Sequence, residues 1–121
     1  MSAKRPHVLL VDDDESFRRV QEYQLERAGY EVTASADGLS ALERFREELH
    51  DVVISDVRMP GMDGPTLVNR LATMLPGVRI VYMSGYTDGL LEQDLKAAGR
   101  AFLGKPFTIE QLTDTLAREL A

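Results

Sequence analysis

Three short runs of apolar residues constrain this chain most, because they are apolar at every position rather than at alternate ones. They are Val8–Val11, Val52–Ile54 and Ile80–Met83. A strand with one face in water alternates apolar and polar residues, whereas a strand covered on both faces does not need to. These runs therefore predict central strands of a parallel sheet that has helices on both sides.

Strands and helices are expected to alternate along the whole chain. The expected strands are His7–Val11, Tyr30–Ala34, Asp51–Ser55, Val78–Met83 and Ala101–Gly104. The expected helices are Glu15–Ala28, Leu39–Leu49, Gly64–Leu75, about Asp88–Ala98, and Ile109–Leu120. Consecutive strand–helix units joined by right-handed crossovers form a doubly wound α/β sheet. We therefore predict one domain over residues 7–121, after an N-terminal tail of residues 1–6.

Local signals predict the ends and the buried faces of these helices. Gly29 stops the first helix, Asp63 is the expected N-cap of the third, and Thr108 begins a capping-box pattern before the fifth. The first helix is expected to bury Phe17, Val20, Leu25 and Ala28, and the second Leu42, Phe45 and Leu49.

Composition excludes several kinds of function. The chain has 14 Lys and Arg against 20 Asp and Glu, a net charge of −6, which disfavours direct binding to nucleic acid. It has no Cys, which excludes disulfides, thiolate metal sites and a Cys nucleophile. We see neither a signal peptide nor a membrane-spanning stretch, so a cytoplasmic domain without membrane insertion is expected.

Polar side chains follow four of the expected strands. Asp12 and Asp13 follow the first strand, Asp56 the third, Ser84 the fourth and Lys105 the fifth. In a doubly wound sheet, ligands bind at the carboxyl ends of the strands. Crowded carboxylates repel by about 4 kcal/mol per pair at an effective dielectric of 20, and a hard divalent cation such as Mg²⁺ relieves this repulsion. Lys105 and Ser84 could then hold the oxygens of a phosphoryl group.

Each of these residues also has a simpler interpretation. The acidic residues 12–15 could serve only to cap a helix and favour its N-terminus, and Asp56 could be an ordinary turn aspartate. Ser84 and Lys105 could be a strand-end serine and a solvated lysine. The position of all four strand ends on one edge of the sheet favours a shared site. We assign Asp14 and Glu15 to the helix start alone.

Four sequence blocks resemble the receiver domain of two-component response regulators. The blocks are Leu9–Asp13, Ser55–Gly64, Met83–Tyr86 and Phe102–Phe107, within a resemblance that runs from about Val8 to Leu120. The resemblance implies a flavodoxin-like receiver fold, a five-stranded sheet in the order 2-1-3-4-5 with five helices. Together the blocks are specific, whereas any one of them alone would be weak.

The resemblance also implies a role for each residue. Asp56 would be the phosphoacceptor, and Mg²⁺ would be bound by Asp13, Asp56 and the backbone carbonyl of Arg58, with Asp12 reaching it through water. Lys105 would pair with the phosphoryl group, and its bond to Pro106 would be cis. Ser84 and Phe102 would form the switch that responds to phosphorylation. Because Phe102 has no hydroxyl, this switch would rest on packing.

The expected partner is a histidine kinase or a histidine phosphotransfer protein. The short segment between Gly99 and Phe102 is similar to receivers that stand alone or are attached to a hybrid histidine kinase, so a covalently attached kinase module is a further expectation. Such a receiver catalyses its own phosphorylation and dephosphorylation and is not a metabolic enzyme.

Three alternatives remain open at this point. The first is a pseudo-receiver, a protein-interaction module that is never phosphorylated, although such modules typically lose one or more of the site residues retained here. The second is a small Mg²⁺-dependent phosphohydrolase, which would usually need a second acid and a cap domain. The third is a flavodoxin-like electron carrier, which an acidic first loop disfavours.

Overall fold

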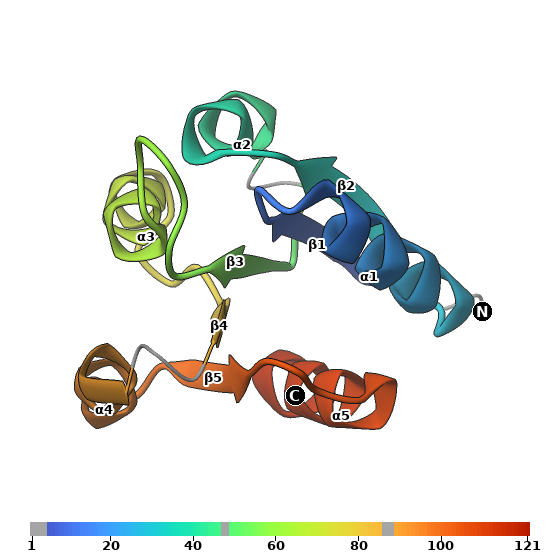
Figure 1. Cartoon of the computed structure of the whole chain (residues 1–121). Helices are drawn as coiled ribbons and strands as arrows, with labels where there is room; N and C mark the ends of the chain where they lie inside the picture. The colour runs from blue at the N-terminus through green and yellow to red at the C-terminus, as the bar shows by residue number, and fades with distance from the viewer. Residues whose placement is uncertain (1–4, 47–48, 86–88) are drawn as a thin grey trace.

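The sheet is parallel and five-stranded, as the apolar runs predict. The computed structural model describes residues 5–46, 49–85 and 89–121, with the backbone alone over residues 89–92. The strands are β1 (His7–Val11), β2 (Glu31–Ser35), β3 (Val52–Asp56), β4 (Ile80–Ser84) and β5 (Ala101–Gly104). They lie in the order β2-β1-β3-β4-β5, and every neighbouring pair is parallel (Figure 1). This order confirms the predicted doubly wound, flavodoxin-like fold.

Helices cover both faces of the sheet. They are α1 (Glu15–Arg27), α2 (Gly38–Arg44), α3 (Gly64–Met74), α4 (Gly89–Ala97) and α5 (Ile109–Leu120). Figure 1 shows α1 and α5 on one side of the sheet and α2, α3 and α4 on the other. Asp63 caps α3 by accepting the Thr66 N–H, and Thr108 with Gln111 forms a capping box on α5. None of the helices in the described residues has the length and apolarity that a membrane crossing requires.

Two hydrophobic cores lie on opposite sides of the sheet. In β1, Val8 and Leu10 pack toward Leu25 and the α5 residues, whereas Leu9 and Val11 pack into the core on the other face. All four β1 residues from Val8 to Val11 have an exposed fraction of 0%. Burial on both faces explains why this strand is apolar at every position.

The second helix is shorter than the sequence predicts. It ends at Arg44, and Phe45 has extended backbone angles (φ −66°, ψ 133°). The amides of Leu49 and His50 both donate to the carbonyl of Arg46, which forms a turn instead of continuing the helix. His50 is buried and its ring stacks on Phe45, while Leu49 is 40% exposed. The prediction that Leu49 faces the core was therefore wrong, because His50 fills that place.

The buried face of α1 also differs from the prediction. Val20 is 54% exposed and Ala28 is exposed, whereas Gln21 and Leu25 are buried. The inward stripe of α1 thus follows Phe17, Gln21 and Leu25 at intervals of four residues. We expected an apolar residue at each inward position and so overlooked the polar Gln21.

Several predicted element ends are wrong by one or two residues. β2 and β3 each begin and end one residue later than expected, and β4 runs from Ile80 to Ser84 rather than from Val78 to Met83. The shift in β3 places Asp56 inside the sheet, where it is in register with Met83. Tyr86, Thr87 and Asp88, together with residues 1–4 of the expected tail, lie outside the described residues.

Candidate functional site

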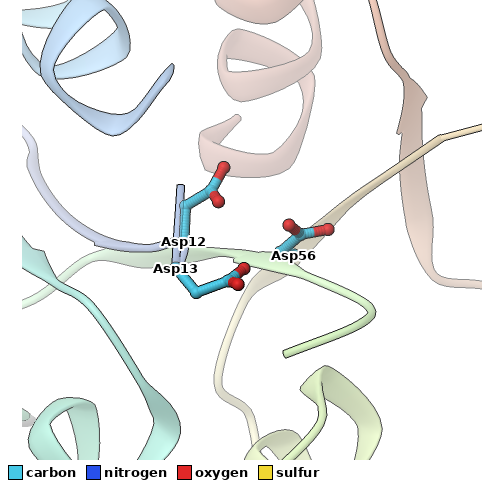
Figure 2. Close-up of side chains that lie close together, drawn as sticks. All are labelled: Asp12, Asp13 and Asp56. Carbon is cyan, nitrogen blue, oxygen red and sulfur yellow. The ribbon is translucent and has the colours of Figure 1, made fainter. Parts of the chain in front are cut away.

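Three carboxylates meet at the carboxyl ends of β1 and β3. These strands are neighbours, and Val11 of β1 pairs with Ser55 of β3. The residue after each of these two, Asp12 and Asp56, therefore lies beside the other. One carboxylate oxygen from each of Asp12, Asp13 and Asp56 lies within 4.8 Å of the others. Figure 2 shows the Asp13 carboxylate pointing toward Asp56. The sheet topology therefore creates the acidic cluster that the sequence predicts.

Asp12 is completely buried, and each of its polar atoms has a partner. Its backbone N–H donates to the Ser35 carbonyl (3.1 Å), and its carbonyl accepts from Nη1 of Arg18 (2.7 Å). Its Oδ1 accepts from the Asp14 N–H (2.9 Å), and its Oδ2 accepts from Nζ of Lys105 (3.1 Å). These bonds fix the loop after β1, and the neighbouring Asp13 remains exposed.

Asp14 and Glu15 lie at the start of α1, as predicted. Asp14 Oδ1 accepts from the Phe17 N–H at 3.1 Å and so caps the helix. Glu15 pairs with Arg19, one turn along the exposed side of the helix, at 2.8 Å. Neither residue belongs to the group of three carboxylates within metal-binding distance in the described structure.

Lys105 places its ammonium between two of the three carboxylates. Nζ lies 3.1 Å from Oδ2 of Asp12 and 3.1 Å from Oδ2 of Asp56. Burial lowers the pKa of Lys105, but the charges of Asp12 and Asp56 and their hydrogen bonds outweigh burial, so the net shift is upward. The Lys105–Pro106 peptide bond is cis, as the resemblance implies.

Asp56 is a buried carboxylate whose pKa is raised. It is 9% exposed, and desolvation raises its pKa to about 6, against the opposing effect of the Lys105 charge and hydrogen bond. The charges of Asp12 and Asp13 are smaller contributions to the same upward shift of this pKa. A buried carboxylate beside two others and an ammonium is typical of a functional site.

The remaining predicted site residues lie around this cluster. Ser84 is the buried last residue of β4, and its carbonyl accepts from the Lys105 N–H at 2.7 Å. Phe102 is in β5, in register with Tyr82, and is partly buried against the core. Arg58 is exposed in the loop between β3 and α3. Their proposed roles stay predictions.

Gly64, whose backbone touches the site, was not among the predicted site residues. A Cβ atom at this position would lie 2.4 Å from the Asp56 carbonyl oxygen and 3.1 Å from the Val57 Cα. The Gly64 N–H donates to the Val57 carbonyl at 2.8 Å. Glycine at the start of α3 therefore lets this helix approach the residue that ends β3. The signal was the Asp63-Gly64 pair, which we had used only to cap the third helix and as part of the Ser55–Gly64 block.

The donor set fits a hard divalent cation. All three clustered side chains offer carboxylate oxygens, the ligand type that Mg²⁺ prefers. Three carboxylates against the single ammonium of Lys105 leave two negative charges, which match a divalent ion. Octahedral coordination at about 2.1 Å needs ligand oxygens roughly 3 to 4 Å apart. Oxygens within 4.8 Å can meet this spacing through a small adjustment or a bridging water.

Comparison with known proteins decides the family. A family model described as "Response regulator receiver domain" matches residues 8–117. The chain belongs to the response regulator receiver domains. Its fold is also that of a chemotaxis protein, CheY4 of Vibrio cholerae, with a TM-score of 0.87, 38% identity and coverage of 97% of this chain and 100% of that one.

Related receivers occur both alone and inside larger proteins. The receiver protein CpdR of Brucella abortus is 36% identical over 93% of this chain and 95% of its own length. The sensor kinase CckA of the same organism is 40% identical over 93% of this chain, but the match spans only 12% of that kinase. This receiver is thus a module of two-component signalling and not a metabolic enzyme.

Proposed function

We propose that this receiver accepts a phosphoryl group on the carboxylate of Asp56 from a phosphohistidine of a kinase or phosphotransfer protein. The observation that carries the proposal is the position of Asp56 at the end of β3, 3.1 Å from the Lys105 ammonium and within the acidic cluster. Receiver domains as a family support this assignment, and so does the similarity to sporulation initiation phosphotransferase F of Bacillus subtilis, 30% identical over 93% of this chain and 92% of its own length.

The reaction exchanges one phosphorus bond for another. An Asp56 carboxylate oxygen attacks the phosphorus, the bond from phosphorus to the donor imidazole nitrogen breaks, and its electron pair returns to that nitrogen. Lys105 holds the incoming oxygens by charge and hydrogen bonding, from the position that it already occupies beside Asp56. Mg²⁺, when bound by Asp13, Asp56 and the Arg58 carbonyl, with Asp12 reaching it through water, would neutralise the charge on the phosphoryl oxygens.

The signal would leave the site through Ser84 and Phe102. The Ser84 hydroxyl, at the buried end of β4, would move toward the phosphoryl oxygens when Asp56 is modified. Phe102 is only partly buried against the core, so an inward rotation would bury more of its ring. A change of this kind at a packed pair is how phosphorylation biases a two-state element.

The relatives are consistent both with a receiver attached to a kinase and with a free-standing receiver. The kinase CckA carries a similar receiver, and CpdR is a receiver of nearly the same length as this chain. We propose output through protein contacts, without direct binding to nucleic acid, because the chain has a net charge of −6. A cytoplasmic location is part of the same proposal.

Intact-mass spectrometry after incubation with acetyl phosphate and Mg²⁺ tests the proposal. We expect one phosphoryl group per chain in the wild type, and none in Asp56→Asn or in the presence of EDTA. A wild-type protein that binds Mg²⁺ but takes no phosphoryl group from this donor or from phosphoramidate would favour the pseudo-receiver.

The Mg²⁺ assignment has a separate test in Asp13→Asn. This variant removes one carboxylate from the cluster, so its melting temperature without metal should rise slightly and its gain on adding Mg²⁺ should vanish. Asp14→Asn is the matched control, because it changes the charge equally, keeps an N-cap residue and lies outside the cluster. An unchanged Mg²⁺ response in Asp13→Asn would remove Asp13 from the metal site.

A further inference from the structure

The ring of Phe17 lies against the cation of the site. Lys105 Nζ is over the Phe17 ring, 4.3 Å from its centroid. The same nitrogen donates to Asp12 and to Asp56, each at 3.1 Å. The ammonium therefore contacts two carboxylates and one aromatic face, from the loop after β1, the end of β3 and the first turn of α1. Neither the proposed reaction nor the acidic cluster accounts for this third contact.

We propose that Phe17 is a positioning residue that holds the Lys105 ammonium at the phosphoryl site. The inference rests on the proposed function, since it names a residue that prepares Lys105 for the same reaction. The face of an aromatic ring carries partial negative charge and attracts a cation without offering a hydrogen-bond acceptor. It can thus retain the ammonium without competing with phosphoryl oxygens for its N–H groups.

Phe17 is itself fixed from two directions. Its backbone N–H donates to Asp14 Oδ1 at 3.1 Å, which sets the first turn of α1. Its ring meets that of Phe107 nearly at a right angle (88°), with the centroids 5.9 Å apart. Phe107 follows Lys105 by two positions, so the segment that carries the ammonium also carries the ring that supports Phe17. Both rings pack against the core between the sheet and α5.

The location of the ring explains why it should matter. The Lys105 side chain is 21% exposed, so its flexible stem could otherwise turn the ammonium toward water. When Asp56 takes a phosphoryl group, the ammonium must exchange its hydrogen bond to the Asp56 carboxylate for one to the phosphoryl oxygens. The Phe17 face keeps its attraction in both states. A cation–π contact of this kind changes an equilibrium by about 2- to 30-fold.

The first test reads the position of Lys105 in the unphosphorylated protein by NMR. Protons above an aromatic ring resonate upfield, so the ε-methylene protons of Lys105 should be shifted upfield in the wild type and in Phe17→Tyr. In Phe17→Leu they should return to the ordinary lysine position. Phe45→Leu is the control, because its ring lies in the core on the opposite face of the sheet. An ordinary lysine shift in the wild type would overturn the proposal.

The second test asks whether the contact serves the reaction. Phe17 is replaced site-specifically by phenylalanines with increasing numbers of ring fluorines, which withdraw charge from the face and hardly alter its shape. The rate of phosphorylation by acetyl phosphate should fall stepwise, to about a third to a tenth in the most fluorinated ring. The Mg²⁺ affinity should stay within twofold, and Phe17→Tyr should restore most of the rate lost in Phe17→Leu.

The two proposals fail in different ways. If fluorination left the phosphorylation rate unchanged, or if the rate fell only in Phe17→Leu, Phe17 would be a packing residue. The proposed function of Asp56 would be unaffected by that result. A wild-type protein that takes no phosphoryl group would contradict the proposed function, while the NMR shift would still decide whether Phe17 holds Lys105.

Discussion

Lys105 Nζ lies 3.1 Å from Oδ2 of Asp56, although β4 lies between β3, which ends at Asp56, and β5, which Lys105 follows. The Lys105 side chain reaches across the end of β4, where the Lys105 N–H also donates to the Ser84 carbonyl at 2.7 Å. Lys105 therefore contacts the Asp56 carboxylate through its ammonium and Ser84 through its backbone. A change at Asp56 can reach both β4 and β5 through this lysine.

Replacing Lys105 by Met should separate metal binding from phosphorylation. The variant leaves Asp12, with an exposed fraction of 0%, without its cationic partner, which should cost about 1 to 3 kcal/mol of unfolding free energy in EDTA. The gain in melting temperature on adding Mg²⁺ should persist and grow, because three carboxylates then lack a counterion. Phosphorylation by acetyl phosphate should slow by at least about tenfold, since one charged donor to the phosphoryl oxygens is lost.

Lys96→Met is the matched control for this variant. This variant removes the same charge as Lys105→Met. In the wild type, however, the Lys96 ammonium lies over the Phe102 ring, 5.9 Å from its centroid. Its Mg²⁺ response and phosphorylation rate should stay close to those of the wild type. Equal losses in the two variants would mean that net charge, and not the position of Lys105, sets the rate.

The raised pKa of Asp56 predicts a specific dependence of stability on pH. The folded protein holds the Asp56 proton up to a pKa of about 6, against the ordinary value of 3.8 in the unfolded chain. The folded state therefore binds more protons between these values, and its stability falls as pH rises through them. Ionised Asp56 should cost up to about 3 kcal/mol above pH 6, less what solvent screening removes.

Asp56→Asn should remove that cost. In EDTA its melting temperature should exceed that of the wild type at pH 7 to 8, and the difference should shrink to nearly nothing below about pH 4. Asp37→Asn, which changes an exposed charge and keeps a residue suited to the N-cap of α2, should show no such pH dependence. A destabilised Asp56→Asn at pH 8 would contradict the burial of an ionised carboxylate.

Gly64→Ala should distort the site rather than only the helix that contains it. The added Cβ would stand 2.4 Å from the Asp56 carbonyl oxygen, so α3 or the end of β3 must move. We expect a loss of about 1 to 3 kcal/mol in unfolding free energy and a weaker Mg²⁺ response. Gly77→Ala is the control, because its Cβ would meet nothing within 4 Å. Identical thermal shifts for the two variants would disprove the close approach.

The lowered pKa of His50 predicts a second dependence of stability on pH, opposite in sign to that of Asp56. Burial, and then the charge of His7, lowers the pKa of His50 below its ordinary value of 6.5. The unfolded chain therefore takes up a proton first as pH falls, and stability from neutral His50 is lost below about pH 6.5. His50→Gln should lack this loss between about pH 7 and 5, measured as the slope of unfolding free energy. An unchanged slope would show that His50 titrates normally.

The sequence was sufficient to predict the sheet and the members of the acidic cluster. Parallel strands with two buried faces leave a clear apolar signal, and residues that follow adjacent strands must meet at one edge. Local periodicity could not predict that His50 replaces Leu49 in the core or that Gln21 faces inward on α1. Both depend on the space that neighbouring elements leave.

Contacts between segments that are distant in the sequence could not be predicted either. Phe17 and Lys105 are far apart in the sequence, and no motif links them. Their contact is seen only when α1 and the end of β5 are placed together. Gly64 shows the same limit. Its proximity to Asp56 depends on the angle at which α3 leaves the sheet, which residue types alone do not specify.

The most direct measurement identifies the residue that carries the phosphoryl group. The protein is incubated with acetyl phosphate and Mg²⁺ and then treated with borohydride, which reduces an aspartyl phosphate to homoserine. Peptide sequencing by tandem mass spectrometry should find homoserine at position 56 alone, and nowhere in Asp56→Asn. Homoserine at position 12 or 13, or at no position in the wild type, would contradict the assignment of Asp56 as the acceptor.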